Sequence, residues 1–311
     1  MSSPYVQPYA IPSGNYYARN PNYHQNHHHQ QQHPQQYTYR SISIENHLIE
    51  IHKHPYIFDR KLATGRFSSI YAAHRRSDNK PVAIKVLSLV ARDSREISMI
   101  AQSFINEIRM TKRLTGKSNH IVDLYDFDFH QTGLSFLVME LGYQDLEKYL
   151  SQRSALLSTE KKGIWRQLVN IVVTLQNSHI MHLNISPDNL ILFYGNIIKL
   201  TDFGIAQKVN EPRSLTYGTP PYSAPELTIV SRHHAPILTT KADIWSLGAI
   251  LYRMIYMTPP DYIEPCYRPP PNQNSVHDSY LSSILRHTLL IDAKERSDAL
   301  WLSKHPYTTT V

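Results

Sequence analysis

Four side chains have the types and the order that phosphate and metal binding require. Lys85 ends the apolar stretch VAIK, and Glu107 lies in the later stretch FINEIRM. A lysine at the end of a strand reaches the phosphates of ATP when a carboxylate on the following helix holds it in place. Asp202 follows the apolar run IIKL and offers the carboxylate oxygen that Mg²⁺ prefers, and Asn189 offers an amide oxygen to a second ion. These residues predict binding of a nucleotide together with magnesium.

The stretch HLNISPDN, residues 182–189, has the spacing of a loop that carries the catalytic base of phosphoryl transfer, but residue 184 is Asn where a carboxylate is expected. Upstream, LATGRFSSIY (62–71) lies where a glycine-rich loop would cover phosphates, and only Gly65 remains of three glycines. The side chains of Ala63 and Ser68 at the other two positions restrict close approach of the backbone. Taken singly, each pattern is also typical of an ordinary solvated strand, helix or turn.

The composition indicates a globular protein with an excess of basic residues. The chain has 311 residues, 41% of them hydrophobic, and a formal net charge of +7. This balance favours a negatively charged partner such as a nucleotide, an acidic peptide or a nucleic acid. No dense Lys/Arg block and no aromatic–basic motif stands out, which makes a nucleic-acid-binding module the weakest of these hypotheses.

The cysteine content and the hydropathy pattern bear on the compartment. Cys266 is the single cysteine, so no disulfide forms within the chain, as is typical of a reducing compartment. No run approaches the ~18–20 apolar residues needed to span a bilayer. We expect a protein of the cytoplasm or nucleus that does not enter a membrane.

Composition also divides the chain. Residues 1–50 are predicted to be a disordered tail, because the Tyr-, His-, Gln- and Pro-rich residues 1–40 carry too little apolar surface to offset the entropy cost of ordering. From residue 56, five strand-like stretches enclose one helical stretch at about 95–114. Amphipathic or apolar helical stretches follow, among them 241–256. A strand-rich part before a helix-rich part predicts an α+β protein of two lobes with a cleft between them.

In this order, the stretches resemble the domain of the eukaryotic protein kinases over residues 56–307. The resemblance is greatest to the TTK (monopolar-spindle) checkpoint kinases. It is carried by NEIRMTKRL, IVDLYDFDF, LVMELGYQDLEKYL, KLTDFGIAQ and KADIWSLGAILYRMIY. It implies a bilobal fold, with an N-lobe at about 56–140 and a C-lobe at about 143–307. It also implies binding of ATP with Mg²⁺, Ser/Thr-directed transfer, and a role in chromosome segregation at the kinetochore.

The same resemblance assigns an adenine pocket and three structural residues. Met139 is the expected gatekeeper, and Asp145 is expected near the ribose. The hinge backbone and the residues around the adenine ring are Glu140, Leu141, Gly142, Leu62, Ile70, Ala83 and Ile191. Glu226 and Arg296 are expected to form a buried ion pair, and Asp243 is expected to anchor the backbone of the catalytic loop.

The chain departs from the kinase motif H-x-D-x-K-P-x-N where transfer depends on it. Asn184 replaces the aspartate, and Ser186 replaces the lysine that steadies the γ-phosphate. An amide is not basic near pH 7, and general-base catalysis contributes ~10²–10⁴-fold. The lost lysine removes further electrostatic stabilisation of the transferred group. Thr111 replaces a leucine expected to pack on Phe203, which predicts a looser helix position.

The proline-rich stretch PPDYIEPCYRPPPNQN (259–274) replaces a segment that usually carries a substrate-docking helix. Two main hypotheses follow. The first is a pseudokinase that binds nucleotide and acts as a scaffold or regulator of a protein partner. The second is a slow Ser/Thr kinase with protein substrates, in which Asn184 only positions the substrate hydroxyl. Ser214, Thr216 and Tyr217 are candidate phosphorylation positions, but no activation by phosphorylation is expected, because Leu183 replaces the arginine that usually binds the phosphate.

Overall fold

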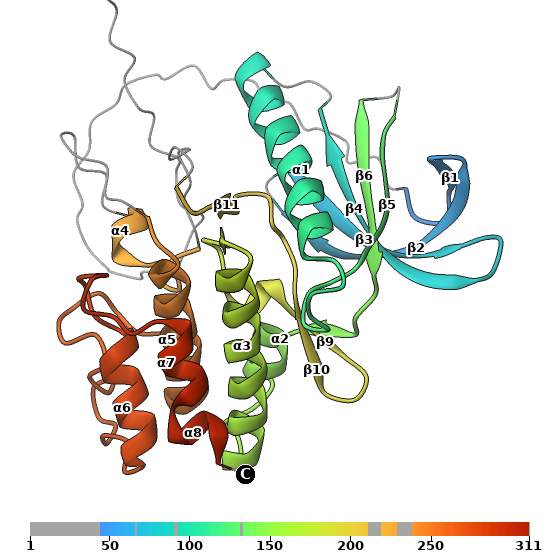
Figure 1. The fold of residues 1–311 in the computed structure, drawn as a ribbon. Helices are drawn as coiled ribbons and strands as arrows, with labels where there is room; N and C mark the ends of the chain where they lie inside the picture. The colour runs from blue at the N-terminus through green and yellow to red at the C-terminus, as the bar shows by residue number, and fades with distance from the viewer. Residues whose placement is uncertain are drawn as a thin grey trace, which may run out of the picture. The chain divides into compact units, whose positions relative to one another are not determined.

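The computed structural model describes residues 44–310, apart from Arg66 and residues 90–92, 131–132, 211–218 and 229–237. Most of the predicted tail and the three candidate phosphorylation positions 214, 216 and 217 therefore lie outside the described residues. Figure 1 shows a sheet with one long helix followed by a helical part. The predicted α+β order, with the strand-rich part first, is confirmed. No helix in the described ranges is both long and apolar enough to cross a bilayer.

A six-stranded antiparallel sheet occupies the first part, in the order β1-β2-β3-β4-β6-β5. Its strands are β1 (Leu48–Ile51), β2 (His54–Thr64), β3 (Ser68–Arg75), β4 (Lys80–Ser88), β5 (Leu124–Phe129) and β6 (Leu134–Glu140). Strand β1 lies inside the range assigned to the tail, so the folded part begins earlier than expected. Ile51 is fully buried and Ile49 packs beside it, which gives this short segment apolar surface that residues 1–40 lack.

The two faces of the sheet have different roles, because successive side chains of a strand point to opposite sides. On strand β4, Val82, Ile84 and Val86 belong to an apolar cluster with Tyr71 and Phe136. Lys85 belongs to the other face. Its register partners are Ile70 on β3 and Leu137 on β6. The strand pairing therefore fixes the direction of Lys85 before any contact of its charge is considered.

Helix α1 (Ser94–Leu114) covers this second face (Figure 1). Asp93 caps its first turn by accepting hydrogen bonds from the N–H groups of Arg95 and Glu96. Ile100 and Phe104 then pack with Leu137 of β6 in a buried cluster. The helix therefore has one apolar side against the sheet, and Glu107 follows Phe104 by three residues on that side.

The helical part surrounds one large core. It comprises α2 (Leu146–Ser151), α3 (Ser158–Asn177), α4 (Pro225–Thr228), α5 (Lys241–Tyr256), α6 (Ser279–Thr288), α7 (Ala299–Lys304) and α8 (Pro306–Thr309). Trp165 of α3 and Trp245 of α5 are fully buried. Nearly every residue of α5 is buried, as its continuous apolar pattern predicts. Residues 259–274 contain no helix, which confirms the effect expected of their prolines.

Short strands and one 3₁₀ turn connect the sheet to these helices. They are β7 (Gln144–Asp145), β8 (Ile180–Met181), η1 (Pro187–Asn189), β9 (Leu190–Phe193), β10 (Ile197–Leu200) and β11 (Gln207–Lys208). Strand β9 pairs with both β10 and β7, and β8 pairs with β11. Asn189 immediately precedes β9, and Asp202 follows β10 by two residues.

Candidate functional site

Lys85 lies between two carboxylates. Its Nζ is 2.8 Å from Oε2 of Glu107 on helix α1 and 2.7 Å from Oδ1 of Asp202, which follows strand β10. The side chains of Lys85 and Glu107 are only 12% and 5% exposed, whereas that of Asp202 is 37% exposed. The predicted Lys85–Glu107 pair is present, and Asp202 joins it.

Burial and charge act in opposite directions on this group. Burial alone would lower the pKa of Lys85, but the negative charges of Asp202 and Glu107 outweigh it and raise that pKa. The Lys85 charge lowers the pKa of Asp202, against the effect of burial. Burial raises the pKa of Glu107, despite the opposing charge of Lys85. The result is a protonated lysine beside an ionised Asp202.

Helix α1 is joined to the segment after Asp202 by a second contact. Nδ2 of Asn106 lies 3.2, 3.1 and 2.7 Å from the carbonyl oxygens of Phe203, Gly204 and Ala206. Asn106 is buried, and Nη2 of Arg109 donates to its Oδ1 at 3.0 Å. Asn106 and Glu107 thus connect helix α1 to the segment after Asp202 and to Lys85, and the looser helix expected from Thr111 stays a prediction.

Asp243 holds the backbone of the loop at 182–189. Its two carboxylate oxygens accept hydrogen bonds from the N–H groups of His182 and Leu183, each at 2.8 Å. Leu183 has a φ of 66°, a conformation that L residues rarely adopt, so these bonds offset local strain. Burial raises the pKa of Asp243 to about 6. The predicted anchoring role of Asp243 is confirmed.

His182 is a neutral structural residue in this loop. Burial lowers its pKa to about 4. The Asn184 N–H donates to Nδ1 of His182 at 3.2 Å, so Nε2 carries the proton and donates to the Thr201 carbonyl at 3.1 Å. The ring also packs edge-on against Phe203, with ring centroids 4.8 Å apart. His182 therefore positions the loop relative to the residues that flank Asp202.

The two degenerate positions, Asn184 and Ser186, offer no group that favours transfer. Oδ1 of Asn184 accepts a hydrogen bond from Oγ1 of Thr219 at 2.8 Å. Ser186 is buried, and its hydroxyl has no hydrogen-bond partner within the described part of the chain. Neither side chain supplies a base or a positive charge.

Two hydrogen bonds hold Asn189 beside the segment that carries Asp202. Its Nδ2 donates to the Asn184 carbonyl at 2.9 Å, which directs the amide oxygen away from that contact. Its backbone oxygen accepts from the Thr201 N–H, one residue before Asp202. The pair of oxygen donors that Asn189 and Asp202 offer suits magnesium, which is commonly held by one or two side-chain oxygens together with phosphates.

The residues assigned to the adenine pocket fall on three neighbouring elements. Ala83 on β4 pairs with Met139 on β6, and Oγ1 of Thr201 contacts Sδ of Met139 at 3.9 Å. After β6, the N–H and C=O of Leu141 have no hydrogen-bond partner among the residues described, so both groups remain available to a ligand. Glu140 forms an ion pair with Lys199 of β10 at 2.6 Å, which ties the hinge to the helical part.

The remaining assigned residues lie around these elements. Ile70 on β3 is the register partner of Lys85, and Leu62 lies at an irregularity of β2 and is 39% exposed. Gly65 donates its N–H to the Ser68 carbonyl at 2.7 Å, which closes the turn between β2 and β3. Ile191 pairs with Asp145 across β9 and β7. The carboxylate of Asp145 caps helix α2 through the Lys148 N–H.

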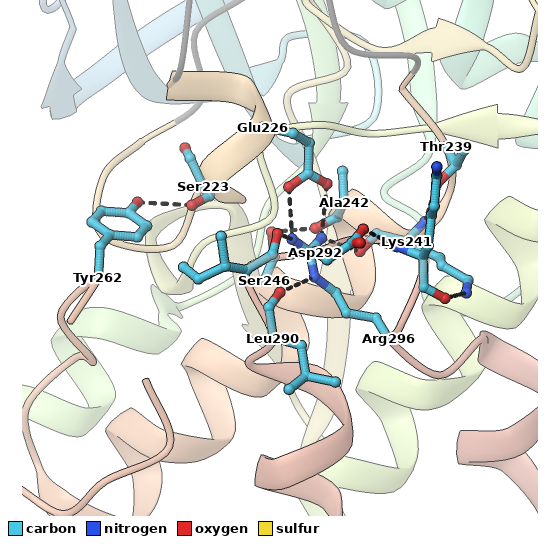
Figure 2. A network of polar contacts seen from close by, with 12 residues as sticks. Ser223, Glu226, Thr239, Lys241, Ala242, Ser246, Tyr262, Leu290, Asp292 and Arg296 are labelled. Carbon is cyan, nitrogen blue, oxygen red and sulfur yellow. Dashed lines mark hydrogen bonds and ion pairs between the residues drawn. The ribbon is translucent and has the colours of Figure 1, made fainter. Parts of the chain in front are cut away.

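Glu226 and Arg296 form the predicted buried ion pair (Figure 2). Nη1 of Arg296 donates to Oε1 of Glu226 and Nη2 donates to Oε2, each at 2.7 Å. The Arg296 side chain is fully buried. Arg296 also donates to the carbonyls of Leu290, Ile291 and Lys241. The pair joins α4, just after Thr219, to the segments around α5 and α7.

Three contacts of this region were not predicted: Asn106 with the segment 203–206, Thr219 with Asn184, and Lys199 with Glu140. Each joins residues that are far apart in the sequence, separated by 97–100, 35 and 59 positions. A polar residue on the buried side of helix α1 was the one available signal, because buried polar side chains require partners.

The comparisons with known proteins agree with this geometry. A family model described as the protein kinase domain matches residues 56–308. The serine/threonine-protein kinase atg1 of Dictyostelium discoideum is 34% identical over 66% of this chain and 30% of its own length. The dual specificity protein kinase TTK of Mus musculus is 28% identical over 84% of this chain and 32% of its own length. The serine/threonine-protein kinase PLK4 of Drosophila persimilis is 34% identical over 64% and 25%. The matches thus span a third or less of each of these relatives.

Proposed function

Since this chain belongs to the protein kinase family, we propose that its kinase domain binds ATP with Mg²⁺ and acts as a pseudokinase, a scaffold or regulator of a protein partner with little or no phosphoryl transfer. The proposal depends on a difference between the residues assigned to nucleotide binding and those assigned to phosphoryl transfer. Lys85, Glu107 and Asp202 form a complete charged group at 2.7–2.8 Å, while Asn184 uses its oxygen to accept from Thr219.

The described residues fit a nucleotide with magnesium. Within the described part of the chain, both backbone groups of Leu141 are without a hydrogen-bond partner. Asn189 directs its amide oxygen away from its hydrogen bond to the loop. We assign Lys85 to the phosphates, Leu141 to the adenine edge, and Asn189 and Asp202 to magnesium. When bound, magnesium would neutralise phosphate charge.

Neither Asn184 nor Ser186 can act as the general base or the phosphate-binding cation of phosphoryl transfer. A neutral amide takes no proton from a substrate hydroxyl near pH 7, and the Asn184 oxygen already accepts a hydrogen bond. Ser186 is uncharged and buried, so the electrostatic contribution of a lysine is missing.

The experiment has two arms on the purified full chain. Thermal-shift titration with ATP, with and without Mg²⁺, tests binding. Lys85→Ala should abolish the stabilisation, whereas the control Lys294→Ala, at an exposed lysine before α7, should keep it. A radiometric transfer assay then compares the wild type with Asn184→Asp and Asn184→Asp/Ser186→Lys. We expect no wild-type transfer above that of Lys85→Ala. Robust wild-type turnover that Lys85→Ala abolishes would refute the pseudokinase proposal, and a flat thermal response at millimolar ATP would refute nucleotide binding.

One observation favours an active, slow Ser/Thr kinase as the second candidate. Glu107 reaches Lys85, and Phe203 is buried against His182, so the side chains of the nucleotide side are in mutual contact. Transfer depends largely on positioning and electrostatics, and an amide can still orient a hydroxyl. The similarity to TTK makes chromosome segregation the process to test for this candidate.

For either candidate we propose action in the cytoplasm or nucleus, supported by the single buried cysteine. A fluorescent fusion of the chain tests this directly, and enrichment at kinetochores would favour the TTK-like role over the others.

A further inference from the structure

A cavity of about 200 Å³ lies between the proline-rich segment after α5 and helix α6, apart from the residues of the nucleotide site. The residues that line it include Tyr267, Arg268, Ser275, Ser282, Leu285 and Arg286. Pockets for drug-sized ligands measure ~300–1,000 Å³, so this cavity suits a single side chain or a small anionic group.

The walls of the cavity are fixed although the segment contains no helix. The hydroxyl of Tyr252 on α5 donates to the carbonyl of Arg268 at 2.7 Å. Nε2 of Gln273 donates to the carbonyl of Tyr256 at 3.3 Å. Leu285, which lines the cavity, and Cys266, which precedes Tyr267, are both buried in the main core. The segment therefore presents Arg268 from a defined backbone position.

Two guanidinium groups line the cavity without a neutralising carboxylate. Arg286, in the last turn of α6, lies over the ring of Tyr267 at 4.9 Å and contacts Oγ of Ser282 at 3.4 Å. The guanidinium of Arg268 has no ion pair or hydrogen bond to any described residue. The cavity lining includes no Asp or Glu, since Asp261 and Glu264 of the same segment lie outside it.

This combination points to an anion that accepts several hydrogen bonds at once. Guanidinium groups form forked, charge-assisted hydrogen bonds with phosphate oxygens, and Arg clusters recognise phosphorylated motifs. The hydroxyls of Ser275 and Ser282 add two neutral donors. Pro265, Tyr267 and Pro269 offer apolar surface beside the charges, on which the chain that carries the anion can lie.

We infer that this cavity binds a phosphorylated serine or threonine side chain of a partner protein, with Arg268 and Arg286 as the phosphate-binding residues. The site is independent of phosphoryl transfer and of nucleotide binding. It gives a function to a segment whose sequence excludes the usual docking helix. A kinase-fold scaffold with this site would hold a partner that another kinase has already phosphorylated.

The test uses the full chain and a fluorescein-labelled peptide, Gly-Gly-phosphoserine-Pro-Gly, measured by fluorescence anisotropy at physiological salt. We expect saturable binding of this peptide and at least about tenfold weaker binding of its unphosphorylated form. Lys85→Ala should bind the phosphopeptide as the wild type does, which separates this site from the nucleotide site.

Three variants assign the site. Arg268→Ala/Arg286→Ala should weaken binding at least about tenfold, Arg268→Lys/Arg286→Lys should have an intermediate effect, and Arg60→Ala, an exposed arginine of β2, should have none. Unchanged melting temperatures verify the fold. Wild-type affinity in the double alanine variant would overturn the inference, as would equal affinity for the unphosphorylated peptide. Competition by inorganic phosphate at the same concentration as the phosphopeptide would also overturn it, because it would indicate a site for the free ion.

Discussion

The side-chain amide of Asn106 on helix α1 donates to the carbonyl oxygen of Ala206 at 2.7 Å, and the same nitrogen lies within 3.2 Å of the carbonyls of Phe203 and Gly204. Glu107, the next residue, contacts Lys85. Adjacent residues of one helix therefore contact the segment that follows Asp202 and the lysine that pairs with Asp202. The position of the helix and the position of the candidate metal ligand are linked through this pair of contacts.

We predict that Asn106→Ala lowers the free energy of unfolding by about 1–3 kcal/mol, because it leaves buried carbonyl groups without a donor. Amide hydrogen exchange should become faster at residues 203–206 and stay unchanged elsewhere. A uniform loss of stability would instead speed exchange throughout the protein. Gln102→Ala on the exposed side of the same helix is the matched control. Unchanged exchange in Asn106→Ala would show that the three contacts do not hold the segment.

Gly142 lies in the hinge, in close contact with β9. A Cβ at this position would lie 2.3 Å from Cγ2 of Ile191 and 2.7 Å from the carbonyl oxygen of Leu192. The Leu192 carbonyl belongs to the backbone of β9, which cannot move aside as the end of a flexible side chain can. We therefore predict that Gly142→Ala lowers the free energy of unfolding by about 1–3 kcal/mol in urea denaturation.

The chain offers a matched control on helix α3. A Cβ at Gly163 would meet nothing within 4 Å, and its backbone is helical. Gly163→Ala should therefore raise the free energy of unfolding by about 0.5–1 kcal/mol. Opposite signs for the two substitutions would support close approach at the hinge, and equal effects would contradict it.

The sequence predicts those features that depend on local pattern or on charge type. Helix α5 has the predicted bounds because its apolar residues continue on all sides. Lys85 and Glu107 were predicted because a lysine ends a strand and a carboxylate lies on the following helix. Asp243 was predicted from the resemblance to the protein kinases. Charged residues restrict which side chains can be neighbours, so their pairings can be predicted from sequence.

Other features have no local signal. Strand β1 was missed because its turn to β2 uses His52 and Lys53 at φ 45° and 70°, where Asn or Gly would be the usual residues. The bond from Thr219 to Asn184 depends on how α4 is held by Glu226 and Arg296. Pairings of this kind follow from tertiary packing, which residue patterns do not specify.

The ion pair of Glu226 and Arg296 provides a third prediction. Arg296 has a fully buried side chain, so Glu226→Gln leaves a buried charge without its partner, which costs ~3–5 kcal/mol. Urea denaturation should show this loss. Asp78→Asn in the exposed ion pair with Arg75 is the comparison and should change stability far less. Similar effects of the two substitutions would argue that the carbonyl contacts of Arg296, rather than Glu226, satisfy its charge.

The last prediction concerns pH. Burial raises the pKa of Asp243 to about 6 from an ordinary value of 3.8, against the hydrogen bonds from the His182 and Leu183 N–H groups. The folded state therefore binds this proton more tightly than the unfolded state. The associated stability is fully present below about pH 4 and is lost as the pH rises through about 6. A shift of about two units corresponds to about 3 kcal/mol.

Asp243→Asn isolates this effect, because every other titrating group is common to both proteins. The free energy of unfolding of the wild type minus that of the variant should fall by up to about 3 kcal/mol between pH 4 and pH 7, whatever its absolute value. Denaturant unfolding at several pH values measures the difference. A difference that stays constant, or that rises with pH, would mean that the two backbone donors outweigh burial and keep Asp243 ionised in the folded loop.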